Sequence, residues 1–174
     1  WDNQVANQIV AQKYFIKPDR DEWKERLQGS IGNDHEHTLA QLVKRVTNFI
    51  VDSGDQLGYF ATQEDRESFR EELAYLQMNR MFAFNSPVQF NAGWYNEYGI
   101  AVNRGVNFVR NPETGEVIKL SNEYVNPQCH ACFIKGPKDN LESILQQVTD
   151  EGVIFSAGSG IGQDIGALRG EGEP

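Results

Sequence analysis

Hydrophobic residues recur at helical spacing through the first part of the chain. Val5 and Ile9 begin one such pattern, which continues through residues 14–16 and predicts an opening helix that ends near Pro18. The following stretch, residues 19–32, is mainly polar, and its candidate core anchors are Trp23 and Leu27. A loop is expected from there to His37.

The strongest amphipathic pattern follows Thr38, which is placed to cap a helix. The apolar stripe of this helix consists of Leu39, Leu42, Val43, Val46, Phe49 and Ile50. Gly54 is expected to stop it. Thr62 and Asp65 have the spacing of a capping box, which opens a further helix that runs to about Met81. The first half of the chain is therefore predicted to be mostly helical.

The pattern changes at Asn85, where a stretch rich in Asn, Gly and aromatic residues begins. Pro87 disfavours a helical conformation of the residue before it, so Asn85-Ser86-Pro87 is most simply interpreted as a helix terminator. Residues 111–115 have the composition of a turn and predict a hairpin. Residues 131–135 then have the apolar character of a short buried strand.

The last third of the chain alternates strand and helix. Asp139 is placed to cap a helix that carries Glu142 at the capping-box position and ends near Gly152 or a few residues beyond. The glycines of residues 158–162 form a predicted turn, and residues 163–168 form a second predicted strand. A strand, a crossover helix and a strand predict the beginning of a parallel α/β sheet.

These patterns divide the chain into three regions. We predict a helical region at residues 1–84, a loop- and hairpin-rich connection at residues 85–127, and the start of an α/β sheet at residues 128–174. Two parallel strands are not stable alone, so further strands are expected beyond Pro174. The chain begins with Trp rather than Met, and it is expected to be a truncated, split or intein-interrupted piece of a longer protein.

Composition and charge exclude several functions. The 174 residues carry a formal charge of −9, with 25 acidic against 16 basic residues, which argues against broad DNA binding. No apolar run approaches the roughly 20 residues of a membrane span, and no secretory signal is visible. Two cysteines do not make the disulfide framework of a secreted scaffold, so a cytoplasmic protein is expected.

The two cysteines occur in Gln-Cys-His-Ala-Cys-Phe-Ile. On a strand, Cys132 shares a face with His130 and Ile134, whereas Cys129 lies at the strand entrance. Three interpretations remain open: buried filler, a redox thiol, or part of a zinc site. Cys129, His130 and Cys132 are too closely spaced to enclose zinc unaided, and no metal ligand is assigned. A thioredoxin-like pair would open a helix, but a strand follows here.

The other candidates each have a simple structural explanation. The glycine cluster follows a helix and precedes a strand, which does not fit a nucleotide fingerprint or a P-loop. Ser86 could place its hydroxyl on an anion. Asp139 is most simply a cap, and Arg169 a solvated charge. Separately, none of these residues establishes a function.

Taken together, four ordered segments resemble the N-terminal part of the catalytic chain of class II, adenosylcobalamin-dependent ribonucleotide reductases. They are Gly58-Tyr59-Phe60-Ala61-Thr62, residues 85–91, residues 128–134, and residues 151–169 with Gly158-Ser159-Gly160. The resemblance covers essentially the whole chain. The aerobic di-metal class shares the cysteine and glycine segments and is the alternative.

The resemblance implies a ten-stranded α/β barrel, begun here by residues 131–135 and 163–168. It implies reduction of a ribonucleotide at the ribose 2′-position by thiyl-radical chemistry. Cys132 matches one of the two reducing cysteines and is expected to project into the barrel, close to the ribose. The implied substrate contacts are Ser86, Ala131, Cys132, Ser159 and Gly160. Cys129 has no implied role.

The resemblance also implies partners. Asp139 and Arg169 match residues that contact a deoxynucleoside triphosphate effector, and an arginine fork suits phosphate oxygens. The family uses adenosylcobalamin, a thioredoxin-like reductant and a homodimer, and the remaining catalytic residues must lie outside this sequence. We therefore expect no reductase activity from these residues alone. An effector-binding or assembly module and a zinc-binding structural domain are the other hypotheses.

Overall fold

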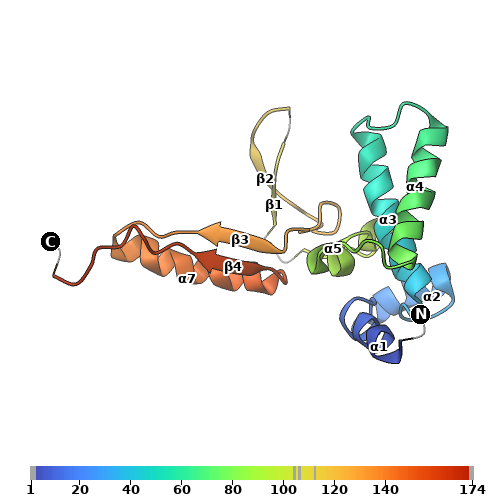
Figure 1. Ribbon diagram of the computed structural model, residues 1–174, viewed down its shortest axis with the longest axis horizontal. Coiled ribbons are helices and arrows are strands. Elements are labelled where there is room, and N and C mark those ends of the chain that lie inside the picture. The colour runs from blue at the N-terminus through green and yellow to red at the C-terminus, as the bar shows by residue number, and fades with distance from the viewer. Residues whose placement is uncertain (1–2, 104, 106, 112, 173–174) are drawn as a thin grey trace. The chain divides into compact units, whose positions relative to one another are not determined.

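The computed structural model describes residues 3–103, 105, 107–111 and 113–172 (Figure 1). It divides the chain into two compact units, residues 1–128 and residues 129–174, and each is described by itself. The first unit is mostly helical and carries one short hairpin, and the second consists of two strands and one helix.

Two helices open the first unit. Helix α1 (Gln4–Lys13) starts at an Asn3 cap and ends one turn before the expected boundary at Pro18. Helix α2 (Asp21–Ile31) occupies the mainly polar stretch that follows, and it buries Trp23 and Leu27, the two expected anchors. It ends at Gly32, whose φ of +71° gives the left-handed C-cap that glycine adopts at little cost.

The two longest helices of the first unit begin at capping boxes, as predicted. Thr38 and Gln41 cap α3 (Leu39–Gln56), and Thr62 and Asp65 cap α4 (Gln63–Met78). The prediction that Gly54 stops α3 is wrong, because the helix continues through it to Gln56. A β-carbon at Gly54 would lie 3.1 Å from the Phe60 ring, so this glycine provides room for a packed side chain instead.

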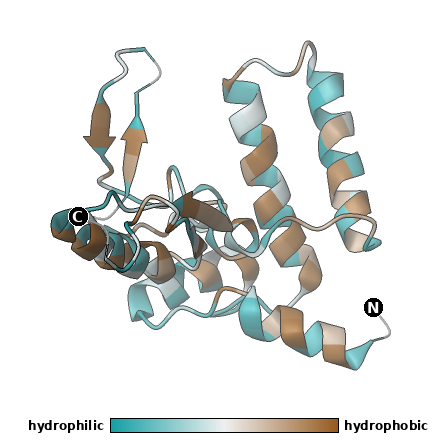
Figure 2. Ribbon diagram, turned by 60° about the vertical axis from the view of Figure 1, so that its left-hand side comes forward, coloured by the Kyte–Doolittle hydropathy of each residue, from teal (hydrophilic) through white to brown (hydrophobic). Residues whose placement is uncertain are grey.

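Hydrophobic and hydrophilic residues alternate along the helices of the first unit (Figure 2). On α3 the buried hydrophobic residues are Leu42, Val43, Val46 and Val51. A second group joins α2 and the segment before it to later segments, and it contains Ile16, Trp23, Leu27, Tyr98 and Ile100. Burial of such side chains stabilises a domain by about 1.5–3 kcal/mol each, so residues 1–128 contain a core of their own.

The terminator predicted at Asn85-Ser86-Pro87 is a helix start. Asn85 accepts a hydrogen bond from the Val88 N–H and caps α5 (Ser86–Asn91). Pro87 is tolerated because the first N–H groups of a helix have no intrahelical partner. Helix α6 (Trp94–Tyr98) follows, and the predicted hairpin is formed by β1 (Phe108–Arg110) and β2 (Val117–Lys119), paired antiparallel. The Pro112 of its turn lies outside the described residues.

The second unit has the predicted order of strand, helix and parallel strand. Strand β3 (Cys132–Lys135) pairs with β4 (Gly160–Gln163), and α7 (Leu141–Ser156) connects them. The cap of α7 is Asn140 and not Asp139, because the Asn140 side chain accepts the Ser143 N–H. The capping-box position predicted at Glu142 is likewise wrong, since Ser143 occupies the third helical position.

The second strand was expected at residues 163–168, but β4 lies three residues earlier and includes Gly160 and Gly162. The residues after Gln163 form bends and turns instead. Glycine runs are typical of turns, and here they are held in a strand by pairing with β3. Among the helices of the described residues, none combines the length and the apolar character that crossing a membrane requires.

Candidate functional site

Cys132 is the first residue of β3, and the parallel register places it directly beside Gly160. Ile134 and Gly162, two residues further along each strand, lie on the same face. This face is open: Cys132 is exposed, and Ile134 is 86% exposed. Buried filler is therefore the wrong interpretation of Cys132. Its expected projection into a barrel, close to the ribose, stays a prediction.

Glycine in β4 leaves the backbone beside Cys132 without side-chain cover. A β-carbon at Gly160 would meet only the Ala131 carbonyl oxygen, at 3.7 Å, which is an ordinary contact. Packing thus does not require glycine here, and a larger side chain would instead occupy the space next to the thiol. The Gly160 N–H donates to the Ala131 carbonyl at 2.7 Å, which brings two predicted substrate contacts together through the backbone.

Ser159 is buried directly before β4, and its hydroxyl donates to the His130 carbonyl at 2.6 Å. Its backbone N–H donates to the Ile154 carbonyl at the end of α7. These bonds tie the crossover helix to the entrance of β3, so Ser159 holds the strand pair in place. Its predicted substrate contact stays a prediction.

Cys129 differs from Cys132 in its surroundings. It is half-buried, and burial raises the pKa of its thiol to about 11. The thiol is therefore neutral near pH 7 and a poor nucleophile. Within the described part of the chain, no three His, Cys, Asp or Glu side chains are grouped as metal ligands, so the zinc hypothesis has no structural support.

The two predicted effector residues are in contact. Arg169 Nε lies 2.8 Å from Asp139 Oδ2, and both side chains are about half-exposed. The pair joins the loop before α7 to the segment after β4, and it leaves part of the arginine fork accessible to solvent. Asp139 is therefore an ion-pair partner and not the helix cap expected from sequence.

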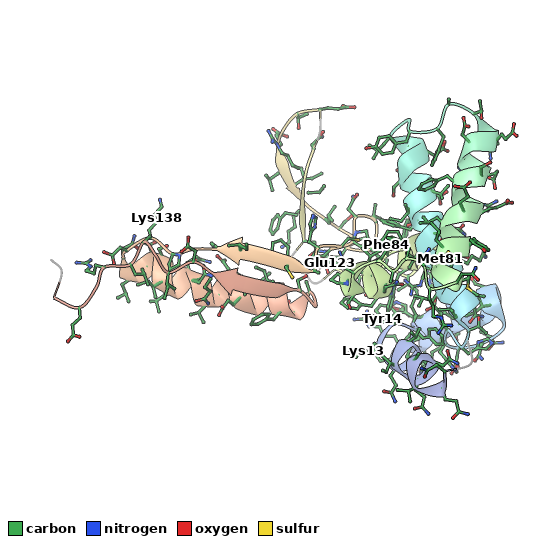
Figure 3. All side chains as sticks on the ribbon, viewed as in Figure 1. Lys13, Tyr14, Met81, Phe84, Glu123 and Lys138 are labelled. Carbon is green, nitrogen blue, oxygen red and sulfur yellow. The ribbon has the colours of Figure 1, made fainter. Side chains whose placement is uncertain are left out.

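Ser86 belongs to the first unit, where it is the exposed first residue of α5. Its hydroxyl oxygen lies 3.0 Å from the phenolic oxygen of Tyr14, the residue at which α1 ends. Figure 3 labels Tyr14, which projects from the end of that helix. The chain therefore places two hydroxyl groups together at the start of α5.

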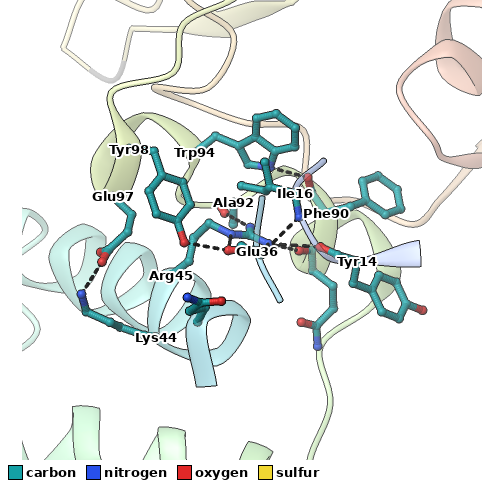
Figure 4. Close-up of polar contacts among 12 residues, drawn as sticks. Tyr14, Ile16, Glu36, Lys44, Arg45, Phe90, Ala92, Trp94, Glu97 and Tyr98 are labelled. Carbon is teal, nitrogen blue, oxygen red and sulfur yellow. Dashed lines mark hydrogen bonds and ion pairs between the residues drawn. The ribbon is translucent and has the colours of Figure 1, made fainter. Parts of the chain in front are cut away.

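A buried ion pair lies beneath α5 and was missed by sequence reasoning (Figure 4). Arg45 of α3 and Glu36 are both fully buried, and Arg45 Nε donates to Glu36 Oε1 at 2.7 Å. Glu36 also accepts the Ile16 N–H and the Tyr98 hydroxyl, at 2.9 and 2.8 Å. Burial, together with the Glu36 charge, raises the pKa of Tyr98 above its usual range.

The guanidinium of Arg45 also holds three separate backbone carbonyls. It donates to Tyr14, Gln89 and Ala92. The last two are carbonyls at the end of α5, which have no intrahelical partner. Gly93 allows this approach, since its φ is +81° and a β-carbon there would lie 2.6 Å from Arg45 Cγ. One buried charge therefore fixes the end of α1 and the end of α5 together.

A sequence signal for this pair exists. Arg45 lies between Val43 and Val46 on the apolar stripe of α3, where a solvated arginine is not expected. A charged residue on a buried helix face requires a partner of opposite charge. Glu36, however, belongs to a loop, and its pairing depends on the tertiary fold.

Comparison with known proteins supplies the family. Residues 1–80 match the model of class II vitamin B12-dependent ribonucleotide reductase, and residues 130–174 match the ribonucleotide reductase barrel domain. Vitamin B12-dependent ribonucleotide reductases of Rhodopirellula baltica and Agrobacterium fabrum are 33% and 32% identical to the chain over 98% of its length. That of Streptomyces clavuligerus is 32% identical over 97%.

The chain spans about 15% of the length of the first two relatives and 13% of the third. The model matched by its first 80 residues is that of the cobalamin-dependent class, which favours this class over the di-metal alternative. The chain therefore belongs to the class II, vitamin B12-dependent ribonucleotide reductases and carries sequence of their N-terminal and barrel domains.

Proposed function

We propose that this chain is part of an enzyme that reduces ribonucleotides to deoxyribonucleotides, and that Cys132 is one of its two reducing thiols. The observation that carries the proposal is the position of Cys132, exposed on a strand face beside a glycine of the neighbouring strand. A substrate could approach the thiol over this bare backbone without displacing a side chain. The names of the relatives supply the substrate class.

In the proposed reaction, the ribose 2′-hydroxyl is replaced by hydrogen and leaves as water. Two thiols supply two electrons and two protons, and they close to a disulfide. One ribonucleotide and two thiols thus give one deoxyribonucleotide, one water and one disulfide. Cys132 supplies one thiol, and the second lies in sequence outside this chain. A thioredoxin-like reductant then reopens the disulfide.

Cys129 is a poor candidate for the same task. It is half-buried, and its raised pKa keeps it protonated at neutral pH. Thiol–disulfide exchange requires access and some thiolate, and both are reduced at this position. Of the two cysteines, Cys132 is therefore the better supported reductant.

The remaining site residues complete the proposal. Ser86, Ala131, Ser159 and Gly160 would contact the substrate, with the Ser86 hydroxyl donating to its phosphates. Asp139 and Arg169 would contact a deoxynucleoside triphosphate effector, and an arginine fork binds phosphate oxygens bidentately. The ion pair between them already holds the guanidinium in place.

The wider assembly is also proposed. The parallel pair of β3 and β4 would be the first two strands of a ten-stranded α/β barrel, preceded by a helical region at residues 1–84 and a connection at residues 85–127. The complete enzyme would be a cytoplasmic homodimer. Support comes from the match of residues 130–174 to the barrel domain.

Adenosylcobalamin, the cofactor implied by the family, supplies the radical chemistry when bound. A corrinoid is a broad, flat group that needs an enclosing surface. This surface would come mainly from sequence outside this chain, which spans about 15% of the length of its first two relatives. The contribution of this chain is therefore limited to its thiol, its hydroxyl groups and its backbone.

The decisive experiment replaces each cysteine in the full-length reductase that contains this sequence. Cys132→Ser is expected to abolish turnover, because no disulfide can close, while circular dichroism and effector binding are retained. Cys129→Ser is the matched control and is expected to keep most activity. Thiol counting after a single turnover without reductant should find Cys132 oxidised only when substrate is present. Multiple turnovers by the Cys132→Ser enzyme would refute the proposal.

A further inference from the structure

We propose that Tyr14 is a positioning residue for the Ser86 hydroxyl, and that it presents this hydroxyl as a hydrogen-bond donor to the substrate phosphate. The inference rests on the proposed role of Ser86. The contact that carries it joins the two oxygens at 3.0 Å, across 72 residues of sequence. It lies entirely within residues 1–128.

The direction of this hydrogen bond follows from what Ser86 has to do. A serine hydroxyl has one proton to donate and two lone pairs that accept. Phosphate oxygens are acceptors, so Ser86 must give its single proton to the phosphate. Tyr14 must then donate to the Ser86 oxygen. A phenol O–H is also a stronger hydrogen-bond donor than an aliphatic hydroxyl, because its oxygen is conjugated with the aromatic ring.

This arrangement does two things for an anion at Ser86. The phenol occupies a lone pair of the serine oxygen, which restricts the hydroxyl rotor and turns its proton away from Tyr14. Donation to the serine oxygen also polarises the hydroxyl, because hydrogen bonds in a chain strengthen one another. Both effects favour binding of the phosphate and leave the chemistry at the ribose unchanged.

The buried charge of Arg45 explains why the two hydroxyls stay together. Its guanidinium donates to the Tyr14 carbonyl at 3.3 Å and to the Gln89 carbonyl at 3.1 Å. Gln89 lies about one helical turn after Ser86, so a single rigid group holds the backbone on both sides of the contact. Glu36 fixes that guanidinium in turn through two hydrogen bonds.

The test measures steady-state kinetics of the full-length reductase with Tyr14→Phe, Ser86→Ala and the double variant. Tyr14→Phe keeps the ring and removes one hydrogen bond, so KM for the ribonucleotide should rise about three- to tenfold. The value of kcat should stay within about twofold. Tyr75→Phe, an exposed tyrosine of α4, is the matched control and should change neither constant.

Two further readouts separate positioning from a general structural effect. The double variant should have the same KM as Ser86→Ala, because Tyr14 acts only through that hydroxyl. Inhibition by the corresponding ribonucleoside, which lacks phosphates, should be unchanged by Tyr14→Phe. Equal weakening of ribonucleoside and ribonucleotide would overturn the inference, as would a double variant whose two effects multiply.

The outcomes also distinguish this inference from the function on which it rests. If Ser86→Ala raises KM and Tyr14→Phe does not, the role of Tyr14 is refuted and that of Ser86 stands. If Ser86→Ala leaves KM unchanged, the phosphate contact is refuted, and the role of Tyr14 fails with it. The Cys132 variants test the redox step independently of both results.

Discussion

The two compact units of this chain bury apolar surface to very different extents. In residues 1–128, aliphatic and aromatic side chains form a closed core, and even a full ion pair is enclosed. In the described part of residues 129–174, the buried side chains are Pro137, Gln147 and Ser159, and none is a large aliphatic or aromatic residue. The larger apolar residues of this unit instead remain exposed, among them Ile134, Leu141, Leu145, Val148 and Ile165.

This contrast shows that an apolar sequence pattern does not by itself lead to burial. Strand β3 and helix α7 have the apolar composition of buried elements, yet two strands and one helix offer too little surface to cover them. The proposed redox thiol lies in this second unit, whereas the first unit holds Ser86 on a fixed scaffold. The buried core of the described residues and the proposed redox thiol thus lie in different units.

The largest expected difference between the two units is in the cooperativity of their unfolding when they are made as separate chains. A chain of residues 1–128 is expected to unfold cooperatively in urea, because it has its own core. A peptide of residues 129–174 is expected to show no cooperative transition, since it buries almost no apolar side chain. Circular dichroism during a urea titration measures both. A sharp unfolding transition of the short peptide would contradict the difference in apolar burial between the two units.

The next effect concerns charge. Glu36→Gln leaves the Arg45 guanidinium buried without a counter-charge, and it should lower the free energy of unfolding by about 3–5 kcal/mol. Asp139→Asn breaks the half-exposed pair of the second unit and should cost less than about 1 kcal/mol. Urea unfolding of the whole chain compares the two variants. Equal losses would show that burial does not set the difference.

Thiol reactivity should differ within the second unit itself. Raising the pKa of Cys129 from 9.0 to about 11 lowers its thiolate fraction near pH 8 about 100-fold. Iodoacetamide should therefore modify the exposed Cys132 first, and the Cys129 rate should keep rising until the pH approaches 11. Mass spectrometry locates the label. In urea both thiols should react at similar rates, and equal rates without urea would contradict the assignment.

Substitution of helix-capping residues should have the smallest effect on the free energy of unfolding. Thr38→Ala removes the side-chain oxygen that accepts the Gln41 N–H, and it should lower the unfolding free energy of the first unit by about 1 kcal/mol. Asn140→Ala removes the cap of α7, and it should reduce helix content without moving the main urea transition. Circular dichroism at 222 nm separates the two results. A shifted main transition in Asn140→Ala would mean that the units unfold together.

Local chemistry made part of this fold predictable. The capping boxes at Thr38 and Thr62 and the parallel order of the second unit depend on short sequence patterns, and they are confirmed. The prediction at Asn85-Ser86-Pro87 was wrong because the same residues suit a helix end and a helix start. The capping bond from Val88 to Asn85 decides between them, and it forms only in the folded chain.

The candidate site was less predictable from sequence. Cys132 and Gly160 were both singled out, but their pairing depends on a register that begins three residues earlier than expected. The contact between Tyr14 and Ser86 joins residues 72 positions apart and has no local signal. The buried pair of Arg45 and Glu36 has one sequence signal, a charged residue on an apolar stripe. The three carbonyls that accept from Arg45 belong to distant segments and have no such signal.

The carbonyl partners of Arg45 have a consequence for the order in which the segments fold. Tyr14, Gln89 and Ala92 are separated from Arg45 by 31, 44 and 47 residues, so loops of that length must close before the guanidinium can be desolvated. Helix α5 is too short to persist by itself. It is therefore expected to become ordered only after α3 is in place, which makes the segment around Ser86 a late product of folding.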